Sequence, residues 1–248
     1  NPVEKERFVT PVRQKTIQKP QQEVGYIPFQ YVEKAVSYNS SFIRFLCGLF
    51  DRYTLESPTI ERLMNDYALG ATKDGCIIYW QIDINGKART GKIMRYNPET
   101  GHRVKDAGGI NWVHSILKKK KLLPDNFNLV QCLFGEQLLK MYPKKPVALV
   151  ESEKSALIAS GVYPEYIWLA TGGKSQLSIE KMKVLHGRTV LAFPDVDGFD
   201  YWKDKAKELE SIGCNVLVSD ILEKNATDQD RTNKIDLADW LIRDLMTD

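Results

Sequence analysis

Two short apolar runs, each ending in an acid and followed by a helical pattern, constrain the fold of this chain most. Residues 147–150 (Val-Ala-Leu-Val) end at Glu151, and residues 189–193 (Thr-Val-Leu-Ala-Phe) end at Asp195 and Asp197. A short apolar run, turn residues and then a helix are typical of a parallel strand in a βα unit. Ligands of such sheets bind beyond the carboxyl ends of the strands. The three acids are therefore predicted to meet at one sheet edge, where carboxylates suit a hard cation such as Mg²⁺ or Mn²⁺.

The βα alternation continues to the end of the chain. Strands are predicted at residues 147–151, 166–170, 189–193 and 215–218. Helices are predicted at residues 153–160 (closed by Gly161), 178–185, 199–212 (closed by Gly213) and 237–245. Right-handed crossovers turn this order into a small parallel sheet with helices on both faces. The predicted fold class is therefore α/β, with this sheet formed by residues 146–248.

The chain before this sheet has a different character. Residues 1–38 contain four prolines and little periodicity, so we expect an extended arm or linker. Residues 39–145 are predicted to form a basic α+β subdomain. Its helices are expected at residues 40–50, 59–66, 112–120 and 127–141, and its strands at residues 76–83 and 89–96. Asn85-Gly86 is the favoured two-residue hairpin turn between those strands.

Charge is distributed unevenly between these parts. Residues 1–146 contain 23 Lys and Arg against 14 Asp and Glu, whereas residues 147–248 contain 12 against 18. This asymmetry fits a first half that meets a polyanion and a second half that holds cations, but uneven surface charge between two domains explains it equally well.

Basic residues cluster on the second strand of the predicted hairpin and beyond it, and aromatic residues lie among them. The basic residues are Lys87, Arg89, Lys92, Arg95 and Arg103, and the aromatic residues are Tyr79, Trp80, Tyr96 and Trp112. Such a mixture suits single-stranded DNA, with phosphates at the cations and bases on the rings. The alternative, in which the aromatic residues form the core of a curved sheet, stays open.

Two further segments have more than one interpretation. The glycine-rich turn at residues 171–175 lacks the spacing of an ATPase phosphate loop, although its backbone and Lys174 suit contact with a phosphate or nucleotide. Asp236 lies at the start of the last predicted helix. It is either the N-cap of that helix or a further member of the acidic edge.

Composition excludes several classes. No apolar run approaches the ~20 residues of a membrane span, and no signal-peptide pattern opens the chain, so we expect a cytoplasmic protein without a membrane partner. The four cysteines lack metal spacing and are interpreted as reduced thiols, and the three histidines are interpreted as structural. Because the first residue is Asn1 and not methionine, we expect a fragment of a longer polypeptide.

The acidic pattern resembles a known domain. Glu151 after residues 147–150, followed by Asp195-Val-Asp197 after a second strand, resembles the Toprim domain of DnaG-type primases, topoisomerases and related nucleases. Residues 234–241 resemble the Asp-rich segment that closes this domain in primases and primase-helicases. The N-terminal portion, at residues 42–47, 86–92 and 110–114, is similar to Toprim-like, primase-like proteins of bacterial mobile elements. Those proteins usually carry a zinc-ribbon segment upstream, which this chain lacks.

This resemblance implies a set of roles. Glu151 would be a general acid or base and an organiser of the metal site, Asp195 and Asp197 would bind Mg²⁺ or Mn²⁺, and Asp236 would be a further ligand. The implied activity is primase-like nucleotidyl transfer on single-stranded DNA, in replication or transfer of a mobile element, with a helicase or relaxase as partner.

The chain departs from the primase pattern at two places. Ser152 stands where primases usually have glycine, and Gly198-Phe199 replaces a small Ala-Gly step. The alternatives are a metal-dependent Toprim nuclease and a non-catalytic DNA-binding Toprim module, and the departures favour the second of these.

Overall fold

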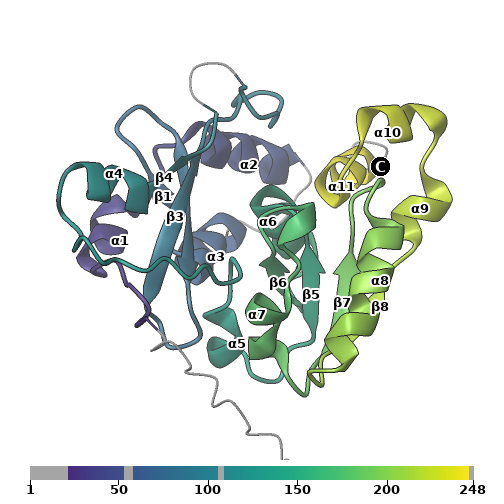
Figure 1. The fold of residues 1–248 in the computed structure, drawn as a ribbon. Coiled ribbons are helices and arrows are strands. Elements are labelled where there is room, and N and C mark those ends of the chain that lie inside the picture. The colour runs from purple at the N-terminus through teal and green to yellow at the C-terminus, as the bar shows by residue number, and fades with distance from the viewer. Residues whose placement is uncertain (1–21, 53–57, 106–108, 246–248) are drawn as a thin grey trace, which may run out of the picture.

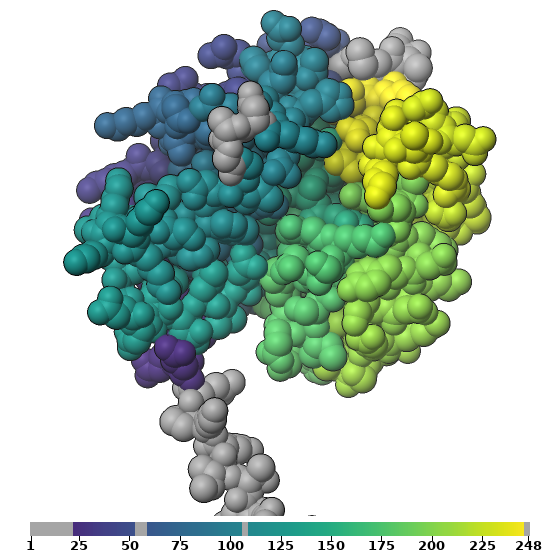
Figure 2. Space-filling model, turned by 45° about the horizontal axis from the view of Figure 1, so that its top comes forward, coloured from purple at the N-terminus to yellow at the C-terminus, as the bar shows by residue number. Residues whose placement is uncertain are grey.

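The computed structural model describes residues 22–52, 58–105 and 109–245, and places an antiparallel sheet beside a parallel one (Figure 1). Figure 2 shows the N-terminal portion, in purple to teal, and the C-terminal portion, in green to yellow, as two lobes in broad contact. Residues 1–21 of the predicted arm lie outside the described residues. Among the described residues, no helix has both the length and the apolar character needed to span a bilayer.

The N-terminal lobe is α+β, as predicted. Its four strands have the order β1-β2-β3-β4, and every neighbouring pair is antiparallel. The strands are β1 (Gly70–Ala71), β2 (Ile77–Ile82), β3 (Ala88–Met94) and β4 (Asn111–Trp112). The helices are α1 (Gln30–Ala35), α2 (Ser41–Arg52), α3 (Pro58–Tyr67) and α4 (Val113–Lys119). The predicted hairpin between β2 and β3 is confirmed, and Gly86 in its turn has φ +76°, which glycine adopts without strain.

The C-terminal lobe contains the predicted four-stranded parallel sheet, in the order β6-β5-β7-β8. Its strands are β5 (Val147–Val150), β6 (Ile167–Ala170), β7 (Thr189–Phe193) and β8 (Asn215–Val218). Its helices are α6 (Glu153–Val162), α7 (Ile179–Met182), α8 (Phe199–Glu210), α9 (Ile221–Asn225), α10 (Asp228–Asn233) and α11 (Leu237–Leu245), with 3₁₀ turns η1 (Lys174–Gln176) and η2 (Lys183–Leu185). The connections β5–α6–β6 and β7–α8–β8 cross the sheet in opposite directions, so right-handed crossovers place α6 and α8 on opposite faces. The prediction of an α/β fold with helices on both faces is confirmed.

The larger hydrophobic core continues from one lobe into the other, without a break at residue 146, where the parallel-sheet domain was predicted to begin. It joins Phe42 and Tyr79 of the N-terminal lobe to Leu149 and Leu169 of the parallel sheet. Polar contacts follow the same junction, since the Tyr67 hydroxyl donates to the Trp168 carbonyl at 2.9 Å. A smaller core lies under the outer face of the antiparallel sheet.

Part of the segment predicted as an extended arm is packed onto the N-terminal lobe. Within residues 22–38, Ile27 forms an antiparallel bridge with Ala88, and α1 follows it. Ile27 and Val32 are buried in the smaller core. The four prolines suggested a linker, but these two apolar side chains hold the segment in place.

The predicted helix at residues 127–141 is wrong. Only its last turn forms α5 (Leu138–Met141), and Phe134 instead makes an antiparallel bridge with Ala170 at the edge of the parallel sheet. Gly135 has φ +82°, a conformation that interrupts a helix. Of the apolar residues in this segment, Leu133, Phe134, Leu138 and Leu139 are buried in the larger core and Phe127 in the smaller one, whereas Val130 and Met141 are exposed.

Gly161 was predicted to close its helix, but it lies inside α6. A Cβ atom at this position would lie 2.3 Å from Cζ of Phe50, so the glycine allows α6 to approach α2 closely. Gly213, in contrast, follows α8 with φ +71° and accepts the turn that ends it.

Candidate active site

The structure brings Glu151 and Asp195 together at the sheet edge. β5 and β7 are neighbours in register, with Val150 opposite Phe193, so the residues that follow them emerge side by side. The Glu151 carboxylate is buried, and its Oε1 accepts a hydrogen bond from the backbone N–H of Asp195 at 3.3 Å. Asp197 lies two residues further and is exposed.

Burial and mutual repulsion act on this pair of carboxylates. Burial, together with the charges of Asp197 and Asp236, raises the pKa of Glu151 to about 7. Burial and then the charge of Glu151 raise the pKa of Asp195 to about 9. Without a cation, the edge therefore retains protons at neutral pH, and a bound cation would favour the ionised carboxylates.

Local backbone explains both departures from the primase pattern. The Ser152 hydroxyl accepts a hydrogen bond from the N–H of Ser155 at 3.1 Å and is the N-cap of α6. A Cβ atom at Gly198 would lie 2.5 Å from Oε1 of Glu151, so a side chain there would displace that carboxylate. Neither residue displaces the acids from the edge.

Asp236 fits the capping alternative. It precedes α11, and its Oδ1 accepts a hydrogen bond from the Asp239 N–H at 2.9 Å, while Oδ2 of Asp239 accepts from the Asp236 N–H at 3.2 Å. The ammonium of Lys154 lies 3.1 Å from Asp236 Oδ2 and 2.9 Å from Asp239 Oδ1. Burial raises the pKa of Asp236, with Asp239 adding to the increase and Lys154 opposing it. All four carboxylate oxygens thus have a partner within the protein.

Two lysines lie at Asp197. Lys174, predicted to contact a phosphate, follows the turn of Gly172 (φ +92°) and Gly173 (φ +148°) and lies 3.6 Å from the Asp197 carboxylate. Its Nζ also donates to the Asp197 carbonyl. Lys234, which the sequence analysis did not single out, lies 3.3 Å from the other carboxylate oxygen. Its αL backbone at the end of α10 directs it there, and no linear motif identifies it.

The predicted basic strip is not a continuous surface. Lys92 is buried and pairs with Glu153 at 2.9 Å, which does not fit the predicted role in contacting DNA. Arg89 pairs with Asp83 at 2.8 Å, and Arg95 pairs with Asp74. Lys87 and Arg103 are exposed.

The aromatic residues near this strip belong to the protein interior. Tyr79, Trp80 and Tyr96 are buried, which is the alternative left open above, and only Trp112 is partly exposed. Tyr26 was not singled out, yet it is exposed, with Lys87 Nζ 4.7 Å and Arg89 Cζ 5.0 Å from its ring centre. Tyr26 thus combines an exposed ring with two of the predicted basic residues, as the sequence analysis had expected for other aromatic residues.

A basic hollow of about 560 Å³ lies beside the N-terminus of α2. Arg44, Lys73 and Arg95 line it, and Asp74, which also lines it, is already paired with Arg95. Arg44 and Lys73 come from segments far apart in the sequence, so linear spacing did not reveal this cluster.

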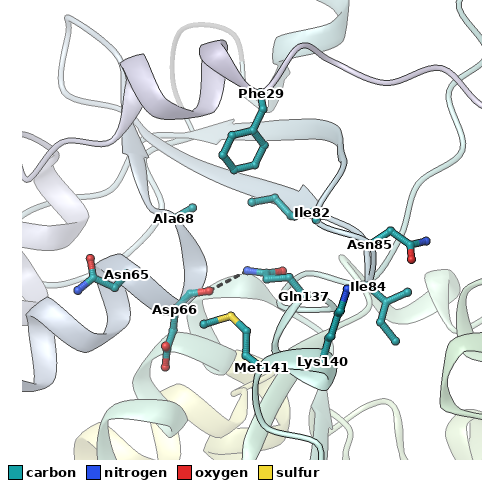
Figure 3. Close-up of a pocket in the computed structure, with 11 residues that line it drawn as sticks. Phe29, Asn65, Asp66, Ala68, Ile82, Ile84, Asn85, Gln137, Lys140 and Met141 are labelled. Carbon is teal, nitrogen blue, oxygen red and sulfur yellow. Dashed lines mark hydrogen bonds between the residues drawn. The ribbon is translucent and has the colours of Figure 1, made fainter.

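Two further cavities differ in character. One of about 570 Å³ lies between the lobes, beside the acidic edge, with His102 on one side and Asp239 on the other. The other, of about 430 Å³, lies near the β2–β3 turn, and Figure 3 shows Phe29 and Met141 on opposite sides of its largely apolar interior. The Gln137 side chain there donates to the Asp66 carbonyl at 2.8 Å. This second cavity does not include the carboxylates of the sheet edge.

The side chains at the edge are carboxylates, the donors that a hard divalent cation such as Mg²⁺ prefers. In the part of the chain that the structure describes, no three His, Cys, Asp or Glu side chains are already gathered into a metal site. Mg²⁺ commonly binds through one or two carboxylates, with water and substrate phosphates completing its shell. Glu151 and Asp195 would supply two such carboxylates, and a cation bound there would offset the burial and the neighbouring charges that raise the pKa values of these two groups.

Comparison with solved structures finds primases. The chain is similar to the primase fragment of the bacteriophage T7 primase-helicase protein, with 13% identity, a TM-score of 0.42, and 90% of this chain and 82% of that chain covered. It is similar to the zinc-binding and RNA polymerase domains of the Aquifex aeolicus primase, with 13% identity, a TM-score of 0.44, and 84% and 60% covered. It is also similar to the RNA polymerase domain of Mycobacterium tuberculosis primase DnaG, with 10% identity, a TM-score of 0.46, and 88% and 80% covered.

A search among curated proteins finds no match. One family model, described as a domain of unknown function (DUF6371), matches residues 40–196, which is more than half of the chain. The matched segment runs from α2 to the turn after β7 and includes Glu151 and Asp195. The chain therefore belongs to the DUF6371 family.

Proposed function

We propose that this chain is a Toprim-like, primase-like nucleotidyl transferase that joins nucleotides on single-stranded DNA with Mg²⁺ or Mn²⁺. The observation that carries the proposal is the pair of Glu151 and Asp195 at the carboxyl edge of adjacent parallel strands, with raised pKa values. Perturbed acids at such an edge favour a reactive site over an ordinary ion pair. The proposed role is in replication or transfer of a mobile element, with a helicase or relaxase as partner.

Each group at the edge has a distinct role in this proposal. Glu151 would take the proton from the attacking 3′-hydroxyl. Asp195 and Asp197 would hold the divalent ion. When bound, that ion supplies charge neutralisation for the triphosphate and activation of the attacking oxygen. Lys174, which is half-buried, and Lys234, which is exposed, lie beside Asp197 and would bind the triphosphate.

The template is proposed to contact the N-terminal lobe. Lys87 and Arg103 are exposed, and the basic hollow formed by Arg44, Lys73 and Arg95 adds a second group of cations. Phosphate contacts of this kind bind nucleic acid without sequence preference and weaken with salt. Tyr26 offers an exposed ring for base stacking.

The first experiment is calorimetric titration of Mn²⁺ into the wild type and into the Asp195→Asn/Asp197→Asn variant. We expect binding by the wild type and none by the variant. The matched control is Asp200→Asn/Asp204→Asn, which removes two exposed acids from α8 and is expected to bind like the wild type. Binding that persists in the Asp195→Asn/Asp197→Asn variant would contradict the assignment of the edge.

The second experiment is a gel assay with single-stranded DNA and nucleotides. Primer synthesis by the wild type, lost in the Asp195→Asn/Asp197→Asn variant, is the expected result. Shortened DNA in place of synthesis would identify a nuclease that uses the same acids.

One observation favours a non-catalytic DNA-binding module as the second candidate. Lys154, Lys174 and Lys234 already pair with acids at this edge, so the protein supplies part of the neutralising charge itself. Such a module would bind single-stranded DNA equally well with Mg²⁺ and with a chelator, and would bind no Mn²⁺ in the titration.

A further inference from the structure

The cavity near the β2–β3 turn has no role in the function proposed above. This turn cavity is lined by residues from the start of α1, the end of α3, the end of β2 with the turn after it, and α5. Its lining residues on α5 precede β5, whereas Glu151 follows that strand, so the cavity is separate from the acidic edge. Its volume of about 430 Å³ lies within the range of small-molecule pockets, about 300–1,000 Å³.

Two apolar side chains lie on opposite sides of the turn cavity. Figure 3 shows Phe29 at the top of the view and Met141 at the bottom, with Ile82 at a height between them. Phe29 is 45% exposed and Met141 is 51% exposed, so both keep much of their apolar surface in water. A flat ring between them would cover these surfaces, which is favourable for an aromatic ligand.

The amide of Gln137 is a polar group of the turn cavity with one atom unused. Its Nε2 donates to the Asp66 carbonyl at 2.8 Å, and a carbonyl can only accept, so the orientation of the amide is fixed. Its Oε1 is buried and accepts no hydrogen bond from the residues that the structure describes. Buried acceptors are rarely left without a donor. A ligand with an N–H group would supply that donor.

Hydrogen bonds hold the walls of the turn cavity in place. The buried carboxylate of Glu136 accepts from the N–H of Ile84 at 3.1 Å and from the N–H of Leu133 at 3.2 Å, which fixes the β2–β3 turn against the segment before α5. The Tyr142 hydroxyl donates to Oδ1 of Asp66 at 2.7 Å, which joins the end of α5 to α3. The walls are therefore formed before a ligand binds, which lowers the cost of binding.

Cationic side chains lie around the turn cavity. Lys140 lines it and is exposed, and Lys87 follows directly after its lining residue Gly86. The acid among the lining residues, Asp66, already accepts from a tyrosine hydroxyl and pairs with Arg62. A phosphate attached to a bound ring would therefore meet lysines at the rim.

We propose that the turn cavity binds a nucleobase that carries an exocyclic amino group, with its phosphate at Lys140. The base lies between Phe29 and Met141, and its amino group donates to Oε1 of Gln137. An apolar side chain of another protein would cover the same surfaces but would leave this oxygen without a donor. The inference does not rest on a metal at the acidic edge, and it gives the chain a second site for a nucleotide.

The test is calorimetric titration of AMP into the full chain with a chelator present. We expect the wild type to bind AMP, and to bind purine riboside 5′-monophosphate, which lacks the amino group, at least about tenfold more weakly. Gln137→Leu should bind the two compounds alike. A wild type that binds no AMP, or that binds both compounds equally, would overturn the inference.

Two variants at exposed side chains keep the inference testable if Gln137→Leu fails to fold. Phe29→Ala and Lys140→Gln should each weaken AMP binding severalfold. The matched controls are Tyr38→Ala and Lys144→Gln, which remove an exposed ring and an exposed cation outside the turn cavity and should bind AMP like the wild type. Unchanged AMP binding by both Phe29→Ala and Lys140→Gln would overturn the inference.

Further arms separate the two sites and the two sources of the base. The Asp195→Asn/Asp197→Asn variant should bind AMP like the wild type, and loss of AMP binding there would place the nucleotide at the acidic edge and overturn the inference. Displacement of AMP by oligo(dA) would identify a base of a DNA strand as the occupant, and its failure to displace AMP would identify a free nucleotide; both results support the site. A wild type that binds no Mn²⁺ contradicts the proposed function and leaves this inference standing.

Discussion

Without a divalent ion, the acidic edge should make the protein less stable as pH rises from 5 to 9. The pKa of Glu151 is raised from 4.5 to about 7 in the folded state, so the folded protein holds this proton more tightly than the unfolded chain does. For a raised pKa, the stabilisation is complete below the unfolded value and is lost as pH rises through the folded value. At 1.36 kcal/mol per pKa unit, Glu151 alone accounts for about 3 kcal/mol.

Asp195 acts in the same direction and extends the effect toward pH 9, where its own raised pKa lies. The charge of Glu151 is one cause of the raised pKa of Asp195, so the two contributions overlap and do not simply add. Urea unfolding at pH 5, 7 and 9 with a chelator present would measure the loss. Saturating Mn²⁺ should restore about 3 kcal/mol at pH 9 if its concentration is near 100 times Kd.

The matched variants are Asp195→Asn and Asp204→Asn. The first removes one of the two interacting charges, so the decrease in unfolding free energy between pH 5 and 9 should be smaller than in the wild type. Asp204 is an exposed acid whose pKa is lowered by its hydrogen bond to Lys207, so its substitution should leave the decrease unchanged in this range. Equal unfolding free energies of the wild type at pH 5 and pH 9 would refute the reasoning.

Two further predictions concern packing that supports the edge. Gly161→Ala should destabilise the protein by about 1–3 kcal/mol in urea unfolding, because the clash with Phe50 exceeds the ~1 kcal/mol gain in helix propensity. Gly48→Ala in α2, where a Cβ meets nothing within 4 Å, should instead stabilise the protein. Equal effects at the two sites would contradict the packing argument. Lys92→Met should lower the free energy of unfolding by about 3–5 kcal/mol, because it leaves Glu153 buried and unpaired. Adding Glu153→Leu should recover most of that loss in urea unfolding. A double variant no more stable than the single one would argue against a simple ion pair.

The parallel sheet and its acids could be predicted because the signals are local. Each strand is a short apolar run with turn residues after it, and the end of the strand fixes where the next residue lies. Glu151 and Asp195 were therefore assigned to one edge without knowledge of side-chain contacts. The role of Asp236 could not be predicted in this way, because the same local sequence fits both an N-cap and a member of the acidic edge. The side-chain contacts with Asp239 and Lys154 distinguish the two.

The N-terminal lobe was less predictable because its errors concern which face of an element is buried. The apolar and aromatic run of β2 and the turn signals around it indicate strands, but both faces of this sheet are covered, so Tyr79, Trp80 and Lys92 are all buried. A sheet with one exposed face would have placed some of them in solvent. The helical spacing within residues 127–141 gave a wrong prediction for a related reason. Apolar spacing indicates a helix when one face is buried, but this segment contributes side chains to both hydrophobic cores.

The buried pair of Lys92 and Glu153 connects the two lobes to the chemistry of the edge. Lys92 comes from β3, and Glu153 begins α6 only two residues after Glu151. Because a buried glutamate without a partner is costly, the antiparallel sheet stabilises the start of α6 and thereby the position from which Glu151 emerges. The hydrophobic core crosses residue 146 in the same region. The basic lobe therefore holds in place the strand end on which the proposed metal site depends.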